Sequence, residues 1–189
     1  MLNNIIDKNI IFLQNHGVKM GSEDDKAVYK YGLQILYLYI IDLAVIFSLA
    51  YSFGKLYETA IMTFIFALLQ VFGGGYHAKT PLKCLLTMVA GAFIGNVIIL
   101  LFAGNILLNI ILTCIVGSII LLLTPVVNKN HPVSRKIKRR SKLIIRVIVI
   151  FILTATIILG YLNRSVEVAA VMVTVNLYVI SLITAKIKN

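Results

Sequence analysis

The residue types that carry chemistry gather in one short segment of the 189-residue chain, between Gly73 and Cys84. This segment holds one of the two cysteines and one of the three histidines, Cys84 and His77, seven residues apart. A cysteine thiolate beside a histidine base is an arrangement for nucleophilic attack on a carbonyl carbon. The pair also has simpler interpretations, because a cysteine at a helix start can be a small packing residue and a loop histidine an interfacial anchor.

The sequence around Cys84 favours the reactive interpretation. The glycines at 73–75 predict the end of one helix, because their backbone entropy and their access to positive φ both oppose its continuation. Thr80 followed by Pro81 predicts the N-cap and the first residue of the next helix. Cys84 is then the fourth helical residue, where unpaired N–H groups, the helix dipole and the neighbouring Lys83 favour a thiolate.

The sequence predicts no metal site and no cofactor. One histidine and one cysteine fall short of the three or four protein ligands that zinc takes. The signatures GxxxxGK[ST], HExxH, paired CxxC and GxSxG are missing from the sequence, so it has none of the common phosphate, zinc and serine-hydrolase motifs. The second cysteine, Cys114, lies inside an apolar run, and we interpret it as a small packing residue.

The composition is that of a membrane protein. The chain is 60% hydrophobic and only 13% charged, with a mean hydropathy of +0.96, whereas soluble chains are roughly 45–50% apolar and about 25% charged. We therefore predict an all-α polytopic membrane protein that forms a single integral-membrane domain over residues 1–189. The net charge of +11 is interpreted as a sign of membrane topology rather than of nucleic-acid binding.

Hydropathy and capping signals divide the chain into its expected elements. Residues 2–14 predict an amphipathic helix at the membrane interface, within a cytoplasmic region 1–28. The sequence Ser22-Glu23-Asp24-Asp25 predicts the cap of the next helix. About six transmembrane helices are expected to form a bundle over residues 31–185, at about 31–53, 57–72, 81–103, 106–126, 143–162 and 166–185. A basic loop is predicted between the fourth and fifth helices, over residues 128–142.

The basic residues predict the orientation. With both termini inside, 15 of the 18 Lys and Arg residues lie in cytoplasmic segments, and the outer turns hold only Lys55 and Arg164. Lys and Arg accumulate on the cytoplasmic side of membrane proteins. We therefore expect a protein of the cell membrane whose termini and His77–Cys84 segment face the cytoplasm, where reducing conditions keep Cys84 a thiol.

The run Gly74-Gly75-Tyr76-His77-Ala78, with Cys84 seven residues after the histidine, resembles the accessory gene regulator B (AgrB) family. The chain length, the polar N-terminal helix, the spans and the basic loop are similar too. The resemblance implies a membrane-embedded cysteine endopeptidase of a Gram-positive bacterium, with Cys84 as nucleophile and His77 as base. The chain departs from the family at Gln70, where members often carry a basic residue.

The resemblance also implies the substrate and the partners. The substrate would be an AgrD-like propeptide, which loses an acidic C-terminal tail through a thioester on the enzyme. It then passes to thiolactone or lactone cyclisation and becomes a quorum-sensing peptide. Membrane lipid is a further expected partner, and the family suggests a homodimer. The basic stretch 135–142 then has two compatible interpretations, because it can bind the anionic leaflet or attract the acidic tail.

Other questions stay open at the level of sequence. A group that orients His77 could be Asp42, although a protonated or helix-paired structural carboxylate is the favoured interpretation of that residue; Gln34, Gln70 and Asn96 are weaker candidates. The alternative function is a small multi-pass transporter or export channel for a peptide or an ion, and a third is a non-catalytic adaptor. The sequence favours the endopeptidase, because it contains no repeated pair of broken helices and few acidic residues deep in the spans.

Overall fold

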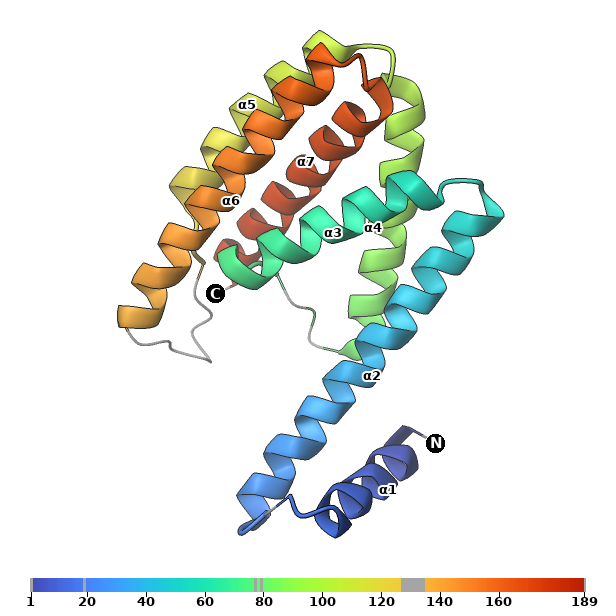
Figure 1. Cartoon of the computed structure of the whole chain (residues 1–189), viewed down its shortest axis with the longest axis vertical. Coiled ribbons are helices and arrows are strands. Elements are labelled where there is room, and N and C mark those ends of the chain that lie inside the picture. Colours follow the sequence, from blue (N-terminus) through green and yellow to red (C-terminus); the bar gives the residue numbers. More distant parts are fainter. Residues whose placement is uncertain (1, 19, 77, 79, 127–134, 189) are drawn as a thin grey trace. The chain divides into compact units, whose positions relative to one another are not determined.

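The computed structural model describes residues 2–18, 20–76, 78, 80–126 and 135–188. Over these ranges the chain forms α-helices and no β-strand (Figure 1). The helices are α1 (Leu2–Asn15), α2 (Glu23–Ser52), α3 (Leu56–Gly73), α4 (Pro81–Phe102), α5 (Ile106–Leu123), α6 (Arg135–Tyr161) and α7 (Ser165–Lys188). Of the part described, six helices, α2 to α7, are long and apolar enough to cross a membrane. The predicted all-α, multi-pass fold is therefore confirmed.

The chain divides into two compact units, residues 1–45 and 46–189. In the first unit, α1 is tied to α2 by an ion pair between Asp7 and Lys30 at 2.7 Å. α2 begins with the predicted capping box, in which Ser22 and Asp25 exchange hydrogen bonds of 3.1 Å in each direction. The helix therefore begins at the predicted cap, eight residues before the apolar span that was predicted from residue 31, because the cap and not the hydropathy marks its first residue. The single domain over residues 1–189 stays a prediction.

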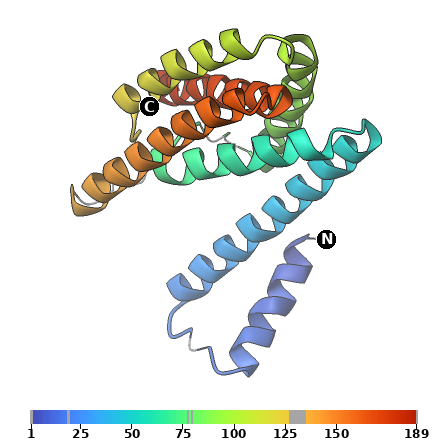
Figure 2. The ribbon, with the colours of Figure 1, turned by 45° about the horizontal axis from the view of Figure 1, so that its top comes forward.

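In the second unit, α7 is the central helix, and α3, α4, α5 and α6 pack against it (Figures 1 and 2). Every residue of α7 from 167 to 175 is buried, as expected for a helix that is enclosed on all sides. The outer helices instead expose large apolar side chains, such as Phe93 and Leu101 on α4 and Phe151 on α6. Exposed apolar faces of this kind suit contact with lipid chains.

Polar contacts tie α3 to α7 at both ends. At one end, the buried carboxylate of Glu167 accepts hydrogen bonds from the Tyr57 hydroxyl at 3.1 Å and from Arg164 Nε at 2.6 Å. At the other end, the Tyr178 hydroxyl donates to the Gly74 carbonyl oxygen at 2.9 Å. The two helices therefore run in the same direction, and the second set of contacts lies where α3 meets the segment predicted to carry the chemistry.

The start of α6 and the end of α5 differ from their predicted positions. α6 begins at Arg135, so the stretch 135–142, predicted as part of a basic loop, is helical. Lys and Arg have high helix propensity, and residues 133–159 contain neither glycine nor proline. α5 ends at Leu123 instead of 126, because Thr124 is extended and the residue before a proline avoids the helical region. Residues 128–134 of the predicted loop lie outside the described ranges.

Candidate functional site

The start of α4 has the predicted form. Thr80 is its N-cap, and the Thr80 hydroxyl accepts a hydrogen bond from the Lys83 N–H at 3.4 Å. The Thr80 carbonyl oxygen accepts from the Cys84 N–H at 3.1 Å. Cys84 thus lies in the first turn of α4, where its half-buried side chain follows the exposed Lys83. Reactive cysteines occur in such partly accessible, electropositive settings.

The two cysteines carry thiols and form no disulfide. Cys114 is half-buried in the middle of α5, which agrees with a packing role. His77 lies outside the described residues, and its pairing with Cys84 therefore stays a prediction. Its chain neighbours Tyr76 and Ala78 are described, and both are half-buried. The described part of the candidate site therefore consists of the residues that lead to His77 and of those that follow it.

The glycines ahead of His77 are required by close packing as well as by backbone conformation. α3 ends at Gly73, and Gly74 then takes a φ of 76°, which favours glycine over every other residue. A Cβ atom at Gly73 would overlap the hydroxyl of Tyr178, and one at Gly74 would overlap the carbonyl oxygen of Val126. The sequence predicted the turn, but the close approach of these two partners becomes visible only in the structure.

Hydrogen bonds from three directions hold the backbone just before His77. The Val126 N–H, which follows α5, donates to the Gly73 carbonyl oxygen at 3.0 Å. The Tyr76 N–H donates to Ser181 Oγ of α7 at 3.0 Å. Gln70 Nε2 of α3 donates to the Tyr76 carbonyl oxygen at 3.3 Å. Contacts with α3, with α7 and with the segment after α5 therefore fix the backbone that leads to position 77.

Of the residues considered for orienting His77, the structure brings Gln70 to this backbone. Asn96 lies twelve residues beyond Cys84 on α4, which corresponds to about 18 Å along a helix. Its Nδ2 atom donates to Thr59 Oγ1 at 2.8 Å and to the Ala92 carbonyl oxygen at 2.9 Å. Asp42 and Gln34 belong to the other compact unit, and a role for either in the site stays a prediction.

Tyr178 and Ser181 contact the site but were not predicted from the sequence. They lie 104 and 105 residues beyond their partners in the chain, and a tyrosine or serine inside an apolar helix has no distinguishing pattern. One signal was available in the sequence: α7 carries an acidic residue near its start, Glu167, and several hydroxyl groups along its length. Such residues in a transmembrane helix tend to face the interior of the bundle.

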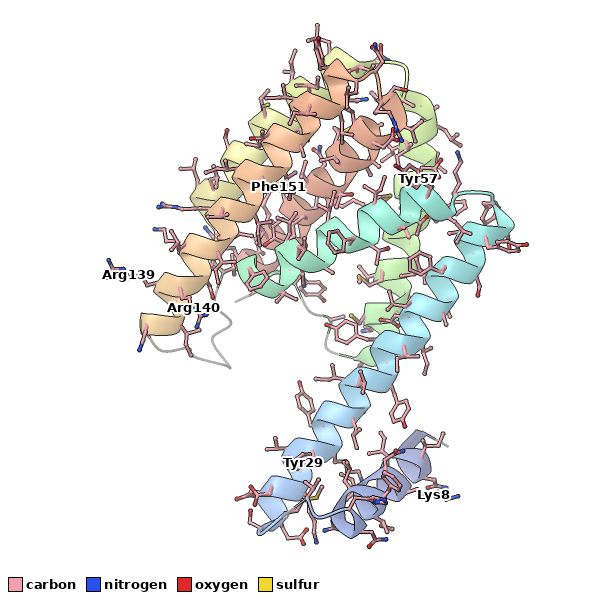
Figure 3. The ribbon with its side chains drawn as sticks, in the orientation of Figure 1. Lys8, Tyr29, Tyr57, Arg139, Arg140 and Phe151 are labelled. Atoms are coloured by element: carbon pink, nitrogen blue, oxygen red, sulfur yellow. The ribbon has the colours of Figure 1, made fainter. Side chains whose placement is uncertain are left out.

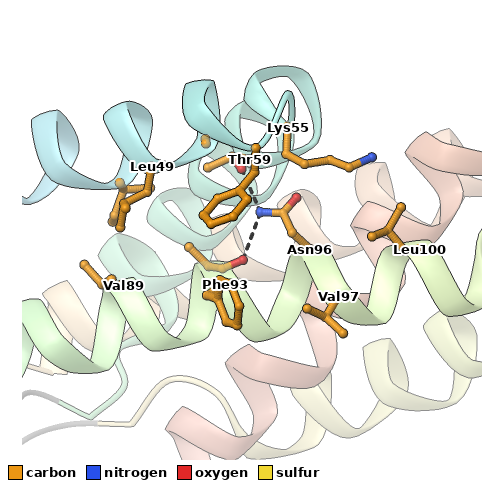
Figure 4. Close-up of a pocket in the computed structure, with 12 residues that line it drawn as sticks. Leu49, Lys55, Thr59, Val89, Phe93, Asn96, Val97 and Leu100 are labelled. Carbon is orange, nitrogen blue, oxygen red and sulfur yellow. Dashed lines mark hydrogen bonds between the residues drawn. The ribbon is translucent and has the colours of Figure 1, made fainter.

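A cavity of about 160 Å³ lies between the end of α2 and α4, beside the start of α3 (Figure 4). Its lining is mostly apolar, and Lys55, Thr59 and Asn96 supply polar groups. Lys55 forms an ion pair with Glu58 at 2.9 Å. Neither cysteine lines the cavity, so it is separate from the candidate site.

The basic start of α6 lies at the same end of the bundle as the glycines. A Cβ atom at Gly73 would come within 3.2 Å of Ile145 Cδ1, so the side chain of Ile145 reaches the end of α3 there. Arg140 precedes Ile145 by five residues, or about 8 Å along the helix. Arg139 and Arg140 project from this first part of α6 (Figure 3), and both are exposed. Cations are therefore available near the site for an anionic lipid or an acidic peptide.

Comparisons with known proteins agree with the resemblance seen in the sequence. Residues 3–184 match the family described as accessory gene regulator B. A protein of Clostridium acetobutylicum described as AgrB-like is 35% identical over 74 residues, which cover 37% of this chain and 35% of that protein. The match thus spans about a third of the length of that relative, and no solved structure matches the chain. Since the family match extends over nearly all of the sequence, the chain belongs to the accessory gene regulator B family.

Proposed function

We propose that this protein is a membrane cysteine endopeptidase that removes the C-terminal tail from an AgrD-like quorum-sensing propeptide. Membership of the family supports involvement in accessory gene regulator peptide processing. The observation that carries the proposal is the position of Cys84, in the first turn of a capped helix. That helix follows a backbone segment that hydrogen bonds hold up to Tyr76, directly before His77.

In the proposed reaction, the His77 imidazole takes the thiol proton of Cys84, and the thiolate attacks the scissile carbonyl carbon. The peptide C–N bond then breaks, the imidazolium gives its proton to the leaving amine, and the tail departs. The remaining propeptide stays on Cys84 as a thioester. The N–H groups and the dipole at the start of α4 stabilise the negative charge on sulfur before the attack.

The thioester leads directly to ring closure. A cysteine thiol of the propeptide attacks the thioester carbonyl, which forms a thiolactone and returns Cys84 as a thiol; a hydroxyl group would form a lactone. The exchange of one thioester for another is nearly neutral in free energy, so closure needs no ATP. Limited access of water at the membrane surface protects the intermediate from hydrolysis. A propeptide bound to the same membrane face also has a raised effective concentration.

We place the site and both termini on the cytoplasmic side. Lys83, the basic start of α6 and Lys186 belong to the end of the second unit where α3 stops and α4 starts, whereas Lys55 and Arg164 belong to the other end. In a variant without native cysteines, Gly104→Cys should react with a membrane-impermeant maleimide in intact cells. Lys186→Cys should react only after permeabilisation. The reverse labelling pattern would contradict this orientation.

The experiment that tests the activity uses the full chain, purified and reconstituted in lipid vesicles, with a panel of synthetic AgrD-like propeptides. Release of the C-terminal tail is followed by mass spectrometry. His77→Ala is expected to lower the rate of release by about 10²–10⁴-fold, the usual contribution of a general base. His16→Ala is the matched control, because His16 is exposed after α1 and bonds only its own turn among the contacts described.

The same assay separates the alternatives. A transporter, an export channel or an adaptor tolerates both His77→Ala and Cys84→Ala without loss of its function. Release of the tail at the wild-type rate by His77→Ala would contradict the endopeptidase proposal. No cofactor is added, because the proposed chemistry needs only the thiol, the imidazole and the membrane lipid. A homodimer and the exclusion of nucleic acid as a partner stay predictions.

A further inference from the structure

The segment Gly74–Tyr76 rests on two hydroxyl groups of α7. The Tyr178 hydroxyl donates to the Gly74 carbonyl oxygen at 2.9 Å, and Ser181 Oγ accepts from the Tyr76 N–H at 3.0 Å. Tyr178 and Ser181 are three residues apart, so both side chains lie on one face of the helix. This face of α7 thus binds both ends of the three-residue segment that immediately precedes His77.

The contact is too close to be a chance approach of a loop to a helix. A Cβ atom at Gly75 would lie 2.9 Å from Ser181 Oγ, and one at Gly73 would overlap the Tyr178 hydroxyl. The Tyr178 ring is completely buried, and Phe66 packs edge-on against it with ring centroids 6.0 Å apart. The core of the bundle therefore fixes the position of the Tyr178 hydroxyl that donates to Gly74.

We infer that Tyr178 and Ser181 are positioning residues for the reaction of Cys84, a conclusion that rests on the proposed function. We assign them no contact with the reacting sulfur or with the substrate. Their hydroxyl groups fix the direction in which the backbone reaches position 77, and so fix the fraction of time for which the imidazole can reach the thiol. A hydrogen bond of this kind contributes about threefold to tenfold in an equilibrium constant.

The test compares hydroxyl deletions on α7. Tyr178→Phe and Ser181→Ala each remove one bond to the segment. Thr174→Val and Thr184→Val are matched controls, because those hydroxyls donate to carbonyl oxygens of α7 itself, at 2.7 Å in each case. Ser181→Thr keeps a hydroxyl and serves as the rescue variant. All are made in a Cys114→Ala background, so that Cys84 is the single thiol.

The first readout needs no substrate. The rate of alkylation of Cys84 by iodoacetamide is measured against pH in lipid vesicles, with His77→Ala as the reference for a thiol without its base. We expect Tyr178→Phe and Ser181→Ala to lower the rate near pH 6.5 by about threefold to tenfold, towards the His77→Ala value. Thr174→Val, Thr184→Val and Ser181→Thr should follow the wild-type profile. In the cleavage assay the same two deletions should lower kcat more than they raise KM.

The outcomes separate this inference from the proposed function. If His77→Ala reduces both alkylation and cleavage while Tyr178→Phe and Ser181→Ala match the threonine controls, the positioning role is wrong and the endopeptidase proposal stands. If the two deletions lower the unfolding temperature but leave the alkylation profile unchanged, their role is only structural and the inference is again wrong. If His77→Ala changes neither readout, the proposed function fails, and the inference fails with it.

Discussion

Cys84→Ala is expected to abolish release of the propeptide tail, to at least about a thousandfold below the wild-type rate. Removal of the nucleophile leaves no route through a covalent intermediate. In enzymes with a nucleophile and a base, loss of the nucleophile alone lowers kcat about as much as loss of all the catalytic residues together. The side chain is half-buried at the start of α4, so its replacement by a smaller apolar group should leave the fold intact. The measurement is tail release by the protein in lipid vesicles.

The second cysteine provides the control. Cys114 is also half-buried and lies in a helix, but in the middle of α5. There the N–H groups of the backbone are already paired within the helix. Cys114→Ala should therefore cleave at the wild-type rate and should change stability by no more than a small packing effect. Equal loss of activity in both variants would point to a structural role for the thiols and would contradict the assignment of Cys84.

Gly74→Ala is expected to lower cleavage by about a hundredfold, the effect of a displacement of about 1 Å near a reacting group. Gly74 has a φ of 76°, and a Cβ atom there would overlap the Val126 carbonyl oxygen. A side-chain rotation can relieve neither the strained φ nor the overlap, because the overlapping oxygen belongs to the backbone of Val126. The segment that leads to position 77 must therefore move away from Val126. Cleavage and the unfolding temperature are measured together.

A glycine that has room supplies the matched control. Gly91 lies within α4, and a Cβ atom there would meet nothing within 4 Å. Gly91→Ala should therefore keep the wild-type rate and the wild-type unfolding temperature. Wild-type cleavage by Gly74→Ala would mean that the backbone before His77 need not be held as the structure has it. That result would remove the basis for any positioning role of α7 as well.

The local signals in the sequence were sufficient for the helices and for the start of α4. Ser22 with Asp25, and Thr80 before Pro81, predicted two helix starts that the structure confirms. Signals of this type succeed because the cap and the helix that it satisfies are adjacent in the chain. Hydropathy succeeded for the number of spans, since a bilayer requires about twenty apolar residues in a row.

Hydropathy was less successful where a helix continues beyond its apolar part. α6 begins at Arg135, although its first eight residues are too polar to be part of a span. Helix propensity, which Lys and Arg satisfy, extends the helix past the point where hydropathy ends. The orientation of the chain in the membrane and the pairing of His77 with Cys84 stay predictions. Both depend on the three-dimensional positions of residues, which a local sequence pattern does not determine.

The support for the site came from contacts that a single sequence does not reveal. The glycines were predicted to free the backbone, yet Gly73 is helical, and its lack of a side chain serves the approach of Tyr178. Tyr178 and Ser181 meet the segment across more than a hundred residues of chain. Only the packing of α3 against α7 brings them together, and that packing is decided by the whole buried surface of the bundle.

The central claim is that the sulfur of Cys84 holds the cleaved propeptide as a thioester. Its most direct test is intact-mass spectrometry of the acid-quenched protein during turnover, followed by peptide mapping. We expect an adduct on Cys84 whose mass equals that of the acyl group of the propeptide without its tail. Neutral hydroxylamine should remove this adduct, and Cys84→Ala should lack it. Tail release while Cys84 stays unmodified, or an adduct on any other residue, would contradict it.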